Sequence, residues 1–62
     1  MIAKGDRVLI KIGTWPATRG EVVDVSRFNV WVMLRGQWAE RAGFERDTVV
    51  QVSPAIVHPA PP

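Results

Sequence analysis

The sequence predicts an all-β fold, a small barrel of five short strands, and three observations support this prediction. Apolar residues recur at every second position over residues 7–12, are interspersed with polar ones over 20–26, and in 30–35 place Val30, Val32 and Leu34 on one face, which is the period of half-buried strands. Glycine, proline and threonine gather between the first two of these runs, as expected where the chain turns. With 62 residues, the chain is long enough for one domain at most.

The first three predicted strands form a meander with one apolar face. The segment from Gly13 to Thr18 is expected to be a loop, because it contains a proline that cannot donate to a ladder. In the third strand, alternation directs Trp31 and Met33 outward. The residues expected in the core are Val8, Ile10, Val22, Val25, Val30, Val32, Leu34 and either Val50 or Val52.

The second half of the chain is expected to close the barrel. The polar segment from Gln37 to Gly43 has room for a 3-10 or single-turn helix before the last strand. Phe44 is expected to open a short fourth strand, and Val49 to Val52 forms the final one. The barrel then covers residues 1–52, and residues 53–62 form a flexible tail that holds four of the five prolines. We expect this tail to be dispensable for folding.

Composition excludes several kinds of function. The chain has no cysteine and one histidine, His58, which lies among the prolines of the tail, so we expect no disulfide, metal or other cofactor. No apolar run is long enough to cross a membrane, and a cytoplasmic location is the simplest expectation. The net charge is only +2, but six of the eight basic residues lie at or before Arg35. An electrostatic binding surface is therefore expected on the first three strands.

The glycines and valines of the first two strands follow a recognisable pattern. Its members are Gly5-Asp6, Val8, Ile10, Gly13, Gly20-Glu21-Val22 and Val25. The segment resembles the KOW motif of ribosomal proteins and NusG-type transcription factors, whose domains are small SH3-like barrels. The resemblance implies an SH3-like barrel that docks on RNA or a ribonucleoprotein. It also places Gly20 at the motif's most characteristic glycine, where a positive φ or a close approach of strands excludes a Cβ.

Basic and aromatic residues interleave along the predicted strands. Cations bind phosphates and aromatic rings stack on unpaired bases, so this combination is typical of a surface for single-stranded RNA. The candidate nucleic-acid-binding residues are Lys4, Arg7, Lys11, Arg19, Arg27, Arg35 and Trp31. The alternative interpretation of the charges is an ordinary solvated exterior.

A second hypothesis assigns the apolar side chains to a protein interface. Three tryptophans in so short a chain provide either barrel-capping core residues or an exposed patch that binds a partner or another copy of the chain. The candidate interface residues are Trp15, Trp31, Met33 and Trp38. Self-assembly would also help to stabilise a domain of this size.

Enzyme chemistry has little support, and we expect no catalytic residue. The chain lacks cysteine, tyrosine and a glycine-rich phosphate loop, and strand alternation is expected to place Glu21 and Asp24 on opposite faces. Residues 5–8, with Lys11, Gly13 and Trp15, are similar to the start of the type II plasmid dihydrofolate reductases. Their Val-Gln-Ile-Tyr signature has only a partial counterpart at residues 50–53, which lacks the tyrosine.

Overall fold

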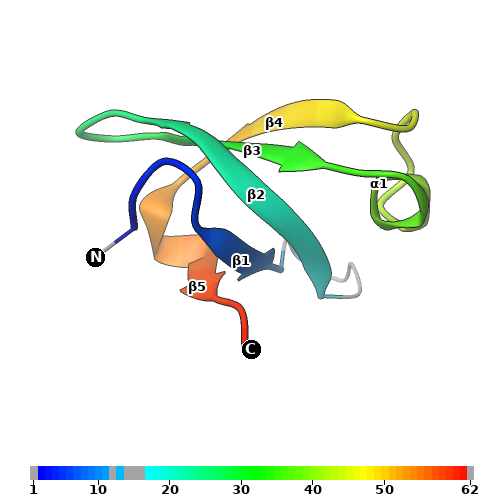
Figure 1. Cartoon of the computed structure of the whole chain (residues 1–62), viewed down its shortest axis with the longest axis horizontal. Helices are drawn as coiled ribbons and strands as arrows, with labels where there is room; N and C mark the ends of the chain where they lie inside the picture. Colours follow the sequence, from blue (N-terminus) through cyan, green and yellow to red (C-terminus); the bar gives the residue numbers. More distant parts are fainter. Residues whose placement is uncertain (1, 12, 14–16, 62) are drawn as a thin grey trace.

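A computed structural model of the protein describes residues 2–11, 13 and 17–61. It consists of one antiparallel five-stranded sheet in the order β4-β3-β2-β1-β5, a short helix and a 3-10 turn (Figure 1). The elements are β1 (Arg7–Ile10), β2 (Thr18–Val25), β3 (Val30–Leu34), α1 (Gln37–Arg41), β4 (Thr48–Val52), η1 (Pro54–Ile56) and β5 (Val57–Pro59). The mostly β fold is confirmed, but the sheet is open, because β4 and β5 form two separate edges.

The longest strand, β2, is the central strand of the sheet and pairs with β1 on one side and β3 on the other. Its residues 18–21 pair with β1, and residues 21–25 pair with β3. Gly20 lies one residue before Glu21, where the two pairings meet, and an added Cβ there would collide with Cγ1 of Val32 and lie 3.0 Å from the carbonyl oxygen of Met33. The described glycines with positive φ do not include Gly20. The close approach of β3, and not a special φ, therefore requires glycine here.

The core lies on one face of the sheet and agrees closely with the predicted one. Seven of the expected residues are buried: Val8, Ile10, Val22, Val30, Val32, Leu34 and Val52. The prediction for Val25 is wrong, because this last residue of β2 is 39% exposed. The additional buried residues are Thr18, Ala39, Ala42 and Val57.

A register shift in β2 changes which side chains share a face. Val22 pairs with Val32, but Asp24 pairs with Trp31, so β2 contains one extra residue between them. Glu21 pairs with Met33, which lies two residues from Trp31 on β3. Glu21 and Asp24 therefore lie on the same face, and the expectation of opposite faces is wrong.

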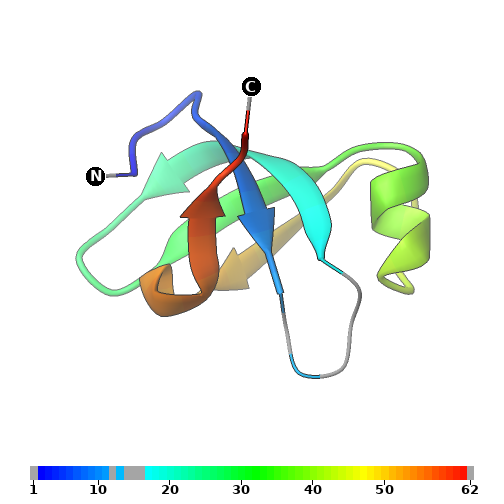
Figure 2. The same ribbon diagram turned by 90° about the horizontal axis from the view of Figure 1, so that it is seen from below.

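The C-terminal segment is part of the sheet, and the expected flexible tail is wrong for residues 54–59. The Ser53 hydroxyl accepts a hydrogen bond from the Ala55 N–H at 3.2 Å, which caps η1. Val57 is buried and pairs with Ile10, and Figure 2 shows β5 alongside β1. Pro59 is tolerated because β5 is an edge strand, where one side of the ladder needs no donor.

The connection between β3 and β4 is helical, as predicted, but it contains no strand at Phe44. The backbone N–H of Phe44 donates to the Ala39 carbonyl at 3.0 Å, which ends α1, and the Phe44 side chain packs against the core. The fifth strand is therefore β5 and not a strand at Phe44. Five strand boundaries also differ: β2 begins at Thr18 and β4 at Thr48, both earlier than expected, and the first three strands end earlier, at Ile10, Val25 and Leu34. Ile12, expected to end the first strand, lies outside the described residues.

We predict that Gly20→Ala destabilises the protein by about 1–3 kcal/mol, because the new methyl group overpacks the contact with β3. Val32→Ala removes the side chain that this methyl group meets. The free energies of unfolding of both variants and of the double variant, measured with urea, give a double-mutant cycle. We expect the double variant to lose clearly less stability than the sum of the single variants. Strict additivity would show that Gly20 is not held against Val32.

We predict that Val57→Asp abolishes the cooperative thermal transition, because it buries an unpaired carboxylate. His58→Asp is the matched control, since the next side chain along β5 is exposed and tolerates a charge. Circular dichroism during heating compares the two variants. Equal melting temperatures for both would show that β5 does not contribute to the fold.

Candidate nucleic-acid interface

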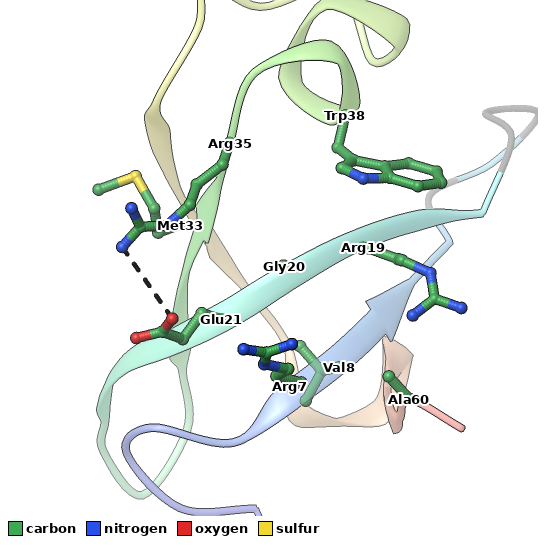
Figure 3. Close-up of a pocket in the computed structure, with 9 residues that line it drawn as sticks. All are labelled: Arg7, Val8, Arg19, Gly20, Glu21, Met33, Arg35, Trp38 and Ala60. Atoms are coloured by element: carbon green, nitrogen blue, oxygen red, sulfur yellow. Dashed lines mark ion pairs between the residues drawn. The ribbon is translucent and has the colours of Figure 1, made fainter. Parts of the chain in front are cut away.

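A groove of about 540 Å³ opens on the outer side of the sheet (Figure 3). It is lined by Arg7, Val8, Arg19, Gly20, Glu21, Met33, Arg35, Trp38 and Ala60. These residues come from the three adjacent strands β1, β2 and β3, from α1, and from the positions directly after β3 (Arg35) and β5 (Ala60). Three of the side chains are guanidinium groups, and only one is a carboxylate.

Strand alternation explains why the three arginines reach one groove. Arg7 precedes buried Val8, Arg19 follows buried Thr18, and Arg35 follows buried Leu34. Each arginine therefore points away from the core side. The β1–β2 register then sets Arg7 directly opposite Glu21, a cross-strand pair of opposite charges.

The charges in the groove do not cancel. The closest ion pair joins Nη2 of Arg35 to Oε1 of Glu21 at 4.0 Å, and both side chains are well exposed. Such a pair contributes little to stability because water screens it. Glu21 therefore neutralises one arginine at most, and the groove keeps an excess of positive charge.

Trp38 supplies the flat apolar wall of the groove. The guanidinium carbon of Arg41 lies 4.9 Å from the ring centroid, and that of Arg19 lies 6.0 Å from it. Both distances lie within the range of cation–π contacts. In Figure 3, Trp38 and Arg19 lie to one side of Gly20, whereas Arg35 and Glu21 lie to the other. The groove thus has an aromatic end and a charged end.

The remaining candidate cations lie outside this groove. Lys4 is exposed in the turn before β1, and Lys11 is exposed after it. Arg27 lies in the turn between β2 and β3, with its guanidinium carbon 5.3 Å from the ring centroid of exposed Phe28. Of the six predicted basic residues, the structure therefore brings together Arg7, Arg19 and Arg35.

The candidate interface side chains occupy different positions on the outer face. Met33 and Trp38 line the groove. Trp31 is half-buried and lies between Asp24 and Gln51 in the register of the sheet, outside the groove. Trp15 lies outside the described residues. The outward orientation predicted for Trp31 and Met33 agrees with their positions between buried residues of β3.

Six groove residues were missing from the predicted nucleic-acid site: Val8, Gly20, Glu21, Met33, Trp38 and Ala60. Outward alternation next to Arg19 could have placed Glu21 there. The position of Ala60 depends on its N–H, which donates to the Arg7 carbonyl at 3.0 Å. No local pattern in a proline-rich segment indicates this contact.

The described part of the chain contains no group of three or more His, Cys, Asp or Glu residues that could hold a metal ion. None of its described helices has the length and apolar character needed to cross a membrane. In comparisons with known proteins, no family model, curated protein or solved structure matches this chain.

Proposed function

We propose that the protein is a non-enzymatic, KOW-like binding module that docks on single-stranded RNA, free or within a ribonucleoprotein. The observation that carries this proposal is the convergence of Arg7, Arg19 and Arg35 with the ring of Trp38 in one groove. Guanidinium groups bind phosphates in a planar, bidentate manner, and aromatic side chains stack on bases that are free of pairing.

The architecture supports an SH3-like assignment for this module. Five short antiparallel strands, with a 3-10 turn before the last one, are the elements that an SH3-like domain requires, although β4 and β5 do not close the sheet into a barrel. The steric requirement for glycine at position 20 agrees with the motif's characteristic glycine. Both observations support the family proposal through packing and not only through sequence pattern.

The groove suggests how a strand would bind. Arg7 binds a phosphate, Arg35 binds another when it leaves its exposed pair with Glu21, and Trp38 accepts a base on its ring. Arg19 lies farther from the Trp38 ring than Arg41 does, so a base that stacks on this ring displaces Arg19 more readily. The displaced guanidinium of Arg19 then binds the phosphate next to that base. The cavity has the size of typical small-ligand pockets, which fits about one or two nucleotides and not a duplex.

We predict that Arg7→Gln, Arg19→Gln and Arg35→Gln each weaken binding to a labelled single-stranded RNA. Fluorescence anisotropy over a series of salt concentrations measures the effect. Each lost phosphate contact should make the negative slope of log K against log salt less steep by about 0.7, because fewer counterions are released. Trp38→Leu should weaken binding by roughly 1–3 kcal/mol without changing the slope, since it removes stacking alone.

Arg46→Gln is the matched control, because it removes the same charge from an arginine that pairs with Glu40 at 3.5 Å outside the groove. This variant should bind RNA nearly as well as the parent protein. The proposal fails if the parent protein does not bind at low salt. It also fails if the control weakens binding as strongly as the groove variants.

We predict that Glu21→Gln strengthens RNA binding and steepens its salt dependence. The substitution removes the groove's only carboxylate and releases Arg35 for phosphate. Asp24→Asn is the control, because Asp24 lies on the same face but outside the groove. Equal gains in affinity from both variants would indicate a general charge effect and contradict a specific role for the groove.

A second candidate function is self-assembly or protein binding through Trp31 and Met33. It is favoured by Val49, which pairs with Met33 on the outer face and is 45% exposed. Under this hypothesis, RNA binding is absent at low salt and the parent protein is an oligomer. Trp31→Ala then reduces its mass in solution, whereas the RNA-binding hypothesis requires no such change.

A further inference from the structure

The two edges of the sheet are protected very differently. The β5 edge has three residues, includes Pro59 and is followed by Pro61. The β4 edge has five residues, Thr48–Val52, with neither a charge nor a proline. Within the described residues, no strand pairs with the outer side of β4. Natural proteins usually block such edges with charges, prolines or bulges, because exposed N–H and C=O groups recruit another strand.

We propose that β4 pairs antiparallel with β4 of a second copy of this chain, around a two-fold axis at Val50. This register uses the whole strand, because it sets Thr48 opposite Val52, Val49 opposite Gln51, and Val50 opposite itself. Backbone donors and acceptors then pair along the full edge. The same surface serves both partners, as two-fold symmetry requires.

The side chains of β4 favour a second copy as the occupant. Because the strand is uncharged, symmetric pairing brings no like charges together, which is the usual obstacle to such contacts. Val50 pairs with buried Val32 but is only half-buried itself. A second Val50 beside it would continue the core face across the axis, and Gln51 of the second copy would cover part of exposed Val49.

The edge also sets the expected strength of this association. Five residues bury less area than the roughly 1,200–2,000 Å² typical of stable interfaces. We therefore expect a reversible dimer whose population rises with protein concentration. Antiparallel edge pairing places the outer faces of both copies on the same side of the joined sheet. The arginine grooves of the two copies would therefore open on that same side. The pairing itself does not depend on the RNA-binding proposal.

Two double variants test both the edge and its register. Val49→Lys with Gln51→Lys places lysines opposite lysines across the axis, and should raise the dimer dissociation constant roughly tenfold or more. Val49→Lys with Gln51→Glu places lysine opposite glutamate, and should retain the dimer. Sedimentation equilibrium over a range of concentrations measures the dissociation constants. Both positions are exposed, and circular dichroism checks that each variant keeps its fold.

The proposal predicts a dimer for the parent protein and for the lysine–glutamate variant, and a monomer for the lysine–lysine variant. A parent protein that remains monomeric up to its solubility limit would overturn the proposal. Equal dissociation constants for the two variants would also overturn it, because another surface or register would then form the contact. RNA affinity, measured separately for each variant, distinguishes failure of this inference from failure of the proposed RNA-binding function.

Discussion

The close contact between Gly20 and β3 is the constraint on which the rest of the structure depends. At this point β2 stops pairing with β1 alone and begins to pair with β3, and any side chain would meet Val32. The contact lets one strand connect both halves of the sheet around a single core. It also fixes Arg19 and Glu21, the two neighbours of Gly20, on the outer side, where they contribute to the arginine groove.

The extra residue in β2 has a comparable influence on the outer surface. Without it, Glu21 and Asp24 would lie on opposite faces, and one carboxylate would point toward the core. With it, both lie on the outer face, paired with Met33 and Trp31. The core remains apolar apart from Thr18. Of the two carboxylates, the groove contains Glu21 alone.

The arrangement of charge is more informative about function than its total. A net charge of +2 is a weak indication of nucleic-acid binding. The fold nevertheless concentrates three arginines around one carboxylate and an aromatic ring. Local positive charge of this kind attracts anions over about one Debye length, even when the whole chain is almost neutral. If β4 pairs with a second copy, the dimer would carry two such grooves on one face of the joined sheet.

The sequence by itself determined the first three strands, the short helix and seven core residues. The alternation of the strands is a local property, since successive side chains point to opposite faces whatever the partner strand is. Only the tertiary structure decided the role of Val57, which pairs with Ile10 far away in the sequence. It also decided the faces of Glu21 and Asp24, because the extra residue in β2 appears only when β2 is aligned with β3. The tertiary structure also decided the groove, because three strands, a helix and the C-terminal segment must meet to form it. Such long-range pairing leaves no local periodic pattern in the sequence.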